Sequence, residues 1–414
     1  MVKPNFSIII IAETVSENLK ACIDNINKFT TLPYEIIIVH TGPNNPNDKN
    51  IDLMQYKHIS CYNMNISSAY NSGLKLSEGD NLVILSSKIT VSANWDRDIL
   101  NCTKLSQNIG LVGQAKRNTK MTKTKSSTSN IVENLDEDFL LIKRKVLDSI
   151  GNFDEIFSSI HFMFSDFFLR ARLAGFELLH CNENYIGKRY NEPLLDKIEY
   201  LDVYQIDRKK FVNKWEKFLP IKDDLISEIL NKLPPKAIGE ELLFLGDNPI
   251  IPNTLINRGY NVSTITCHNG YSILQDKEKL YDIIIFFDNF THESSLIRLL
   301  RDGGKILNQH GLIIINIFNA LFIERIHQVF KGNFSIASLD INRKYPIQCL
   351  SMPEIMASGE IAEMELMYLV GFASNLSTQY QKLFKEICKT NSISKSLKEE
   401  ICIEEYLAIW QKNK

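Results

Sequence analysis

Short aliphatic runs alternate with a helical segment at the start of the chain. The runs are Ser7–Ile11, Tyr34–Val39 and Leu82–Leu85. Between the first two, Glu17–Phe29 carries apolar residues at a helical spacing. Strands separated by helices of this length predict a mostly parallel sheet, whose ligands bind at the carboxyl ends of the strands.

A second alternation of the same kind follows later in the chain. Its predicted strands are Glu241–Leu245, Asn261–Thr266, Asp282–Phe287 and Gly311–Ile317. At 414 residues the chain is too long for one ordinary core. We therefore predict two α/β domains.

The domain boundary is predicted from a proline-containing segment, Lys232–Lys236, which has the composition of a linker. The first domain is expected over residues 1–225, a linker over 226–240 and the second domain over 241–414. The spacing of apolar residues from Ser351 onward is helical, and Glu399–Trp410 resembles an amphipathic helix. A helical C-terminal tail is therefore expected.

The composition excludes several classes of protein. Hydrophobic residues make up 44% and the formal net charge is −2, so a globular protein is expected and nucleic acid is not an expected partner. No apolar run reaches the roughly 18–20 residues of a membrane helix. The eight cysteines are scattered without a Cys-x-x-Cys pair, which is typical of reduced thiols. A cytoplasmic protein without a membrane-spanning segment is expected.

One segment, residues 116–125, is basic and lacks apolar periodicity, and residues 126–130 that follow are polar. The simplest interpretation is a surface loop. The alternative is a loop that closes over an anionic ligand.

Several motifs follow one another in the first domain. They are Glu35–Gly42, Asn65–Leu74, Gly79–Lys88, Ile150–Glu155 and Asp166–Phe176. In this order and spacing they resemble the motifs of family 2 glycosyltransferases. The resemblance implies a GT-A type domain, a sugar-nucleotide donor, and a glycan or protein acceptor in glycan or glycoprotein assembly of the bacterial type.

The same resemblance identifies positions where the chemistry of the family is missing. His40 stands where the family has the acid that binds the nucleotide, and Ser87–Lys88 stand where it has the acid pair that binds a divalent ion. Met163–Phe164 stand where the family has the Glu-Asp pair that contains the usual base, and the position of the late histidine falls near Gly187–Lys188. No divalent metal is therefore expected, and transfer is expected to be weak and metal-independent, or absent.

Two interpretations of these positions stand. In the first, the Lys88 ammonium pairs directly with phosphate oxygens, and a carboxylate elsewhere serves as base. The candidate bases are Asp166, Asp154 and Glu155, and the candidate donor contacts are His40, Asn71, Asp80, Ser86, Ser87 and Lys88. In the second interpretation Lys88 is a solvated residue at a strand end, Asp154 and Glu155 form a turn, and Asp166 pairs with Arg170 one helical turn away.

The second domain resembles the S-adenosylmethionine-dependent methyltransferase fold, a Rossmann-like arrangement. The residues that carry the resemblance are Leu242–Asn248, Tyr281–His292 and Leu307–Asn316. Only Gly246 remains of the three glycines that let the backbone approach the cofactor. S-adenosylmethionine is therefore not expected to bind, although Gly246 marks where it would.

Three functions from different classes follow from these patterns. The first is a metal-independent glycosyltransferase that uses Lys88. The second is a pseudoenzyme, a non-catalytic partner subunit of an active glycosyltransferase. The third, which the single glycine disfavours, is a methyltransferase. A homo-oligomer is left open.

Overall fold

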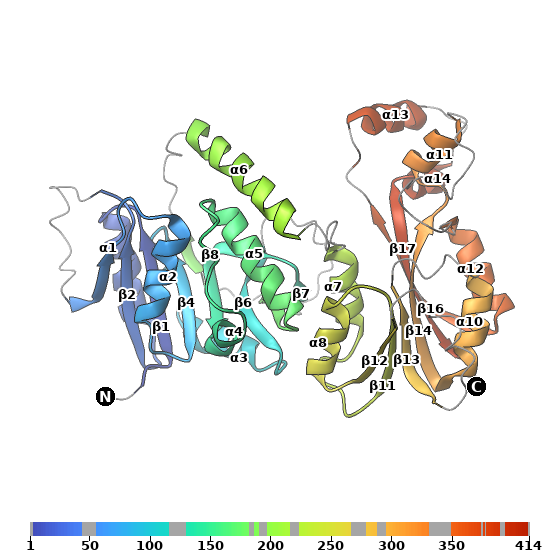
Figure 1. Ribbon diagram of the computed structural model, residues 1–414, viewed down its shortest axis with the longest axis horizontal. Helices are drawn as coiled ribbons and strands as arrows, with labels where there is room; N and C mark the ends of the chain where they lie inside the picture. Colours follow the sequence, from blue (N-terminus) through green and yellow to red (C-terminus); the bar gives the residue numbers. More distant parts are fainter. Residues whose placement is uncertain are drawn as a thin grey trace. The chain divides into compact units, whose positions relative to one another are not determined.

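The computed structural model describes residues 3–43, 55–115, 130–181, 186–189, 197–215, 223–265, 279–287, 295–330, 349–373, 376, 378–389 and 394–412. The chain divides into two compact units, Met1–Lys236 and Ala237–Lys414 (Figure 1). Among the helices described, none is long and apolar enough to cross a membrane.

The first unit contains ten described strands and seven described helices. The strands are β1 (Phe6–Ala12), β2 (Tyr34–His40), β3 (Lys57–Ser60), β4 (Asn81–Ser86), β5 (Ile89–Val91), β6 (Ile109–Ala115), β7 (Asn130–Val132), β8 (Leu135–Lys143), β9 (Glu177–His180) and β10 (Ile186–Arg189). The helices are α1 (Glu17–Phe29), α2 (Ile66–Leu76), α3 (Trp95–Thr103), α4 (Arg144–Ile150), α5 (Ile160–Leu173), α6 (Lys197–Trp215) and α7 (Asp223–Lys232).

Eight of these strands form one sheet in the order β3-β2-β1-β4-β8-β6-β9-β7, while β5 pairs with β10. Strands β3, β2, β1 and β4 run parallel, so their carboxyl ends meet at one edge. Strand β8 is antiparallel to β4 and β6. The predicted α/β architecture is confirmed for this unit.

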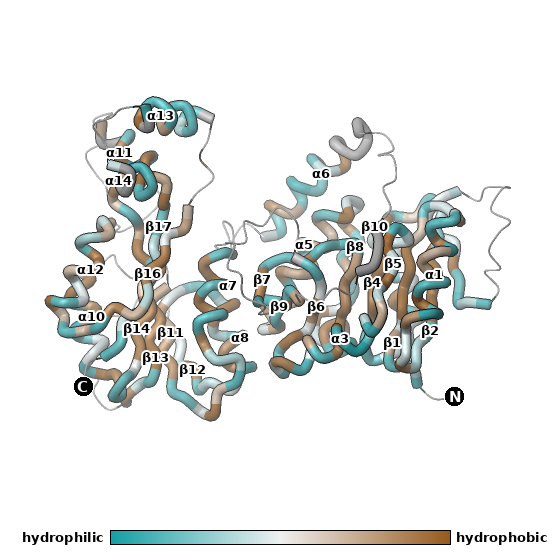
Figure 2. The backbone as a smooth tube through the Cα atoms, turned by 180° about the vertical axis from the view of Figure 1, so that it is seen from behind, coloured by the Kyte–Doolittle hydropathy of each residue, from teal (hydrophilic) through white to brown (hydrophobic). Residues whose placement is uncertain are grey.

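Each face of the sheet is covered by helices. Ile8 and Ile10 of β1 pack with residues of α1 and α3, whereas Ile9 packs on the other face with residues of α2 and α5. This alternation follows from the two-residue period of a strand. The central strands are correspondingly the most hydrophobic segments (Figure 2).

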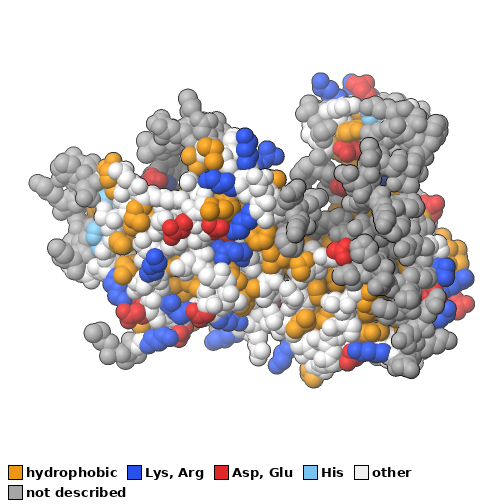
Figure 3. Space-filling view, viewed as in Figure 1, with side chains coloured by type: hydrophobic (Ala, Val, Ile, Leu, Met, Phe, Trp, Pro, Cys, Tyr) orange, Lys and Arg blue, Asp and Glu red, His pale blue; other side chains and the backbone are white. Residues whose placement is uncertain are grey.

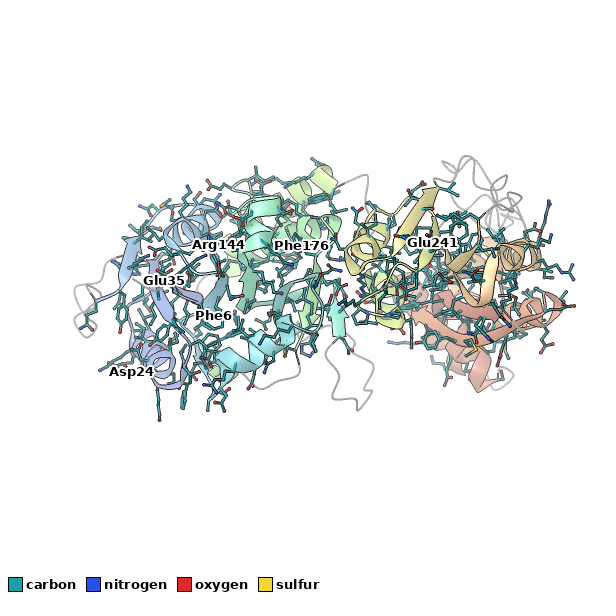
Figure 4. The ribbon with its side chains drawn as sticks, turned by 90° about the horizontal axis from the view of Figure 1, so that it is seen from below. Phe6, Asp24, Glu35, Arg144, Phe176 and Glu241 are labelled. Atoms are coloured by element: carbon teal, nitrogen blue, oxygen red, sulfur yellow. A yellow bond between two sulfur atoms is a disulfide. The ribbon has the colours of Figure 1, made fainter. Side chains whose placement is uncertain are left out.

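A hydrogen-bonded network fixes the amino end of β4. Glu35 accepts hydrogen bonds from the Ser7 hydroxyl at 2.5 Å and from the Glu78 amide at 2.7 Å, and Ser7 accepts one from the Gly79 amide. Arg144 donates to the Gly79 carbonyl at 2.6 Å (Figure 4). The Gly-Asp turn that opens the strand is therefore held at the edge opposite the carboxyl ends.

Two cysteines of this unit, Cys102 and Cys181, form a disulfide. The expectation that all eight cysteines are reduced is wrong for this pair. The pairing depends on α3 lying against β6 and on β9 pairing with β6. A separation of 79 residues cannot reveal such an approach from spacing alone.

The second unit contains a mixed sheet. Its strands are β11 (Glu241–Leu245), β12 (Asn261–Ile265), β13 (Tyr281–Phe286), β14 (Leu307–Asn319), β15 (Cys349–Leu350), β16 (Met364–Ala373) and β17 (Ile403–Lys412). Its helices are α8 (Ile250–Arg258), α10 (Leu296–Lys305), α11 (Ile323–Phe330), α12 (Met352–Ile361), α13 (Thr378–Lys389) and α14 (Lys395–Glu400). The order is β12-β11-β13-β14-β17-β16, with β15 beside β14.

The predicted helical tail is wrong in two places. Strand β16 and strand β17 occupy much of it, and β17 lies between β14 and β16, antiparallel to both. The five residues from Tyr406 to Trp410 are all buried. A strand buried on both faces has no polar alternation, so its sequence is easily mistaken for a helix.

The segment predicted as a linker is partly helical, because α7 extends to Lys232. The Asn231 side chain accepts a hydrogen bond from the Ile131 amide of β7 at 3.1 Å and donates to the Ile131 carbonyl at 3.3 Å. This helix therefore belongs to the first unit.

Candidate functional site

A cavity of about 510 Å³ lies at the carboxyl ends of β1, β2 and β4. Its volume falls in the range of small-molecule sites, about 300–1,000 Å³. Its position is where open α/β sheets bind ligands. The described residues that line it are Ile11, Glu13, Thr41, Ile66, Tyr70, Ser86, Ser87, Lys88, Glu137, Asp138, Ile160, His161 and Tyr204.

Backbone hydrogen bonds hold the strand ends that form one wall. The Thr41 amide donates to the Ala12 carbonyl at 2.9 Å, and the Ser87 amide donates to the Ile11 carbonyl at 3.1 Å. The Lys88 amide donates to the Ser86 hydroxyl at 3.3 Å. Lys88, which is half-buried, therefore lies on a turn fixed between β4 and β5.

The opposite wall comes from β8, α5 and α6. In the register of β4 and β8, Leu85 lies opposite Phe139, so the neighbouring residues Ser86 and Asp138 reach the same edge. Glu137 precedes Asp138, and its Oε1 atom lies 3.5 Å from Nδ1 of His161. The His161 ring stacks on Tyr204 of α6, with centroids 5.7 Å apart.

The charges of the lining residues are unequal. Three carboxylates, those of Glu13, Glu137 and Asp138, face one ammonium, that of Lys88. Like charges repel and opposite charges attract, so the three carboxylates oppose the attraction of Lys88 for a phosphate.

Ser87 and Lys88 do not supply the acid pair that binds the divalent ion in family 2 glycosyltransferases. Ser87 and Lys88 offer a hydroxyl and an ammonium where such an ion needs carboxylates. Within the described part of the chain, no group of three or more His, Cys, Asp or Glu residues is placed to hold a metal ion.

Asp166, a candidate base, lies outside the cavity lining and is fully buried in α5. Its carboxylate is 2.8 Å from Arg170 and 2.6 Å from Lys214, and it accepts a hydrogen bond from the indole of Trp215 at 3.1 Å. One carboxylate oxygen is thus held by Arg170 of the same helix, and the other is held by Lys214 and Trp215 of α6.

Asp154, Glu155 and Asn71 form a second group outside the lining. Asn71 donates to Glu155 at 2.9 Å and accepts from the Phe153 amide at 3.0 Å. Hydrogen bonds from Asn71 and Ser68 lower the pKa of Glu155. Burial raises the pKa of Asp154, but the hydrogen bond with Lys214, 2.6 Å away, and others outweigh it, so that pKa is lowered overall. The group clamps α2 to the loop before α5.

His40 and Asp80 are also absent from the lining. His40 ends β2 and is buried, and its Nε2 atom has no hydrogen-bond partner among the residues that the structure describes. Asp80 lies at the amino end of β4, where its exposed carboxylate pairs with Lys3. Six residues of strand span about 20 Å, so Asp80 and Lys88 lie at opposite edges of the sheet.

The two positions where the family has the Glu-Asp pair that contains the usual general base are part of the core. Met163 and Phe164 are fully buried, and the Phe164 ring packs against those of Tyr70 and Phe153 at 5.7 and 5.1 Å. Of the predicted site residues, the cavity therefore brings together Ser86, Ser87 and Lys88.

Gly246, in the second unit, is explained by packing. A Cβ atom at this position would lie 2.6 Å from the carbonyl oxygen of Phe287. The Phe287 amide in turn donates to the Leu245 carbonyl. The glycine is thus required by the adjoining strand. The positions near residues 266–267 and His292, which the methyltransferase resemblance also involves, lie outside the described residues, and that resemblance stays a prediction.

Glu13, Glu137, Asp138, His161 and Tyr204 were missed by sequence reasoning. A signal was present for two of them, because Glu137 and Asp138 directly precede the aliphatic run Phe139–Ile142. Acids at the beginning of an antiparallel strand reach the same edge as the end of its neighbour. The sequence alone does not show that β4 is the strand beside β8; the strand pairing in the structure does.

Comparisons with known proteins give fold-level likenesses at low identity. No family model matches the chain, and no curated protein matches it. A crystal structure of S. aureus TarS is 13% identical, with a TM-score of 0.35, over 55% of this chain and 47% of that one. The chain thus spans about half the length of that structure.

A second solved structure is the mannosyltransferase PcManGT from Pyrobaculum calidifontis, in complex with GDP-Man and Mn2+. It is 13% identical, with a TM-score of 0.40, over 62% of this chain and 74% of that one. At these values neither likeness bears on what this chain binds or transfers.

Proposed function

We propose that the first unit binds a sugar nucleotide in this cavity and transfers the sugar to a hydroxyl acceptor. The observation that carries the proposal is the position of Lys88, beside Ser86 and Ser87, at the carboxyl ends of parallel strands. An ammonium and two hydroxyls at this edge can meet a diphosphate. The motif order of a family 2 glycosyltransferase supports the same assignment.

Donor binding is expected to be weak, because three carboxylates oppose the single lysine. It is also expected to be independent of manganese, since Ser87 and Lys88 stand where the family has its metal-binding acids. Calorimetric titration with UDP-glucose, UDP-N-acetylglucosamine and GDP-mannose, with and without manganese, measures both properties.

Lys88→Ala should abolish donor binding without unfolding the chain, because the ammonium is the only cation among the described lining residues. Lys20→Ala, at an exposed position of α1, is the matched control and should bind as the unaltered protein does. Equal donor affinity in Lys88→Ala and Lys20→Ala would contradict the role of Lys88.

The charge balance of the cavity also favours a second candidate, a non-catalytic subunit that binds an active glycosyltransferase. In that case no donor binds with or without manganese, and Lys88→Ala has no effect. Purification of the tagged chain from native cells, followed by identification of a glycosyltransferase bound in fixed ratio, tests this candidate.

A further inference from the structure

A histidine and a carboxylate face each other in the wall of the cavity. The Nδ1 atom of His161 lies 3.5 Å from Oε1 of Glu137, and both side chains are partly exposed, at 34% and 23%. A carboxylate beside one ring nitrogen orients the imidazole. Neither residue was among the candidate bases.

Two aromatic rings fix the plane of this imidazole. Tyr204 stacks on it at an interplanar angle of 15°, and Phe162 meets it at 64° with centroids 4.9 Å apart. The ring is therefore restrained on its face as well as at Nδ1.

The backbone that carries His161 is restrained too. Asp207 of α6 is fully buried and accepts hydrogen bonds from the amides of Ser158 and Ser159, both at 2.6 Å. Ser159 is the N-cap of α5, and Asp207 lies three residues after Tyr204 in α6. One carboxylate thus locks together the two helices that position the imidazole and the ring stacked on it.

We propose that His161 is the general base of the transferase and that Glu137 is its positioning residue. The inference rests on the proposed function. The acceptor oxygen attacks the anomeric carbon of the donor sugar, and its proton passes to the imidazole of His161. The bond from the anomeric carbon to the phosphate oxygen breaks, and the nucleoside diphosphate leaves with the electron pair.

The placement of His161 explains how transfer can proceed without the missing carboxylate. His161 lies in the first turn of α5, two residues before the buried Met163. A histidine there reaches the cavity, whereas Met163 and Phe164 point into the core. Glu13 and Asp138 are the other carboxylates that line the cavity.

The test uses the full chain with each of the three sugar nucleotides named above and water as acceptor. His161→Asn should keep donor affinity and slow release of nucleoside diphosphate by about 10²-fold or more, which is the usual contribution of a general base. His327→Asn is the matched control, because His327 also contacts an aromatic ring, that of Tyr380, but belongs to the second unit. It should leave release unchanged.

Several outcomes would overturn the assignment. Release that is unaffected in His161→Asn, or release that is lost in Asp138→Asn but kept in His161→Asn, would place the base elsewhere. A donor that binds the unaltered protein and is never released as nucleoside diphosphate would also reject His161 while leaving the binding proposal intact. Absence of donor binding by the unaltered protein would reject the proposed function itself.

Glu137→Gln separates positioning from structure and serves if His161→Asn fails to fold. Glu137→Gln should keep donor affinity and slow the release of nucleoside diphosphate, because the imidazole loses the carboxylate that orients it. The other charged and titratable groups among the described lining residues are Glu13, Tyr70, Lys88, Asp138 and Tyr204, and they are unchanged in this variant. Release at the rate of the unaltered protein would reject the role of Glu137.

Discussion

We expect Asp166→Asn to lower the free energy of unfolding of the first unit by about 3 kcal/mol. The carboxylate has no exposed surface, and it pairs with Arg170 and Lys214. Removing one member of a buried ion pair costs about 3–5 kcal/mol. The lower end applies here because Arg170 and Lys214 are 17% and 28% exposed, and solvent screens them. Urea denaturation followed by tryptophan fluorescence measures the change.

The matched control is Asp80→Ala, in the same unit. The Asp80 side chain is 66% exposed and pairs only with Lys3 among the partners described, so its loss should cost less than about 1 kcal/mol. If Asp166→Asn is as stable as Asp80→Ala yet loses donor turnover, Asp166 is a catalytic residue after all, as one interpretation of the sequence proposes.

Gly42→Ala should destabilise the first unit by about 3 kcal/mol and weaken donor binding. A Cβ atom at Gly42 would overlap the carbonyl oxygen of Glu13, which is backbone and cannot swing aside. Overpacking of this kind costs about 1–3 kcal/mol. The strain falls between Glu13 and Thr41, which both line the cavity, so the ends of β1 and β2 must separate. Thermal unfolding and calorimetric titration measure the two effects.

Gly304→Ala controls for the substitution itself. Its Cβ atom would lie 3.7 Å from the sulfur of Met364, an ordinary contact, and alanine favours the helix. The variant should be as stable as the unaltered protein or slightly more so. A Gly42→Ala variant that matches Gly304→Ala in stability would show that the two strand ends can separate freely.

The sequence predicts the fold well wherever the apolar residues of a segment follow a single helical or strand period. Helix α1 begins and ends at the predicted residues, and β11 matches its prediction as well. The prediction fails at β17, where residues buried on both faces carry no two-residue alternation. Whether 226–240 acts as a linker stays a prediction, although α7 shows that its first part is helical.

The site is less predictable because it depends on which strands become neighbours. Ser86, Ser87 and Lys88 follow a strand whose carboxyl end is evident from the sequence. His161 and Glu137 are 24 residues apart and meet because the beginning of α5 lies beside the beginning of β8. On the face of the first unit that Figure 3 shows, acidic and basic side chains are interspersed, so the charge on that face gives no further guide to the site.

The position of β17 sets an order in which the second unit can be built during synthesis. Strands β14 and β16 are made first, but they have no direct pairing, because β17 lies between them. Residues 374–402 must be added before the ribosome begins the strand that joins them. Until then β16 pairs with none of the other described strands, and a chain that stops before Ile403 would leave its apolar residues open to association with other nascent chains.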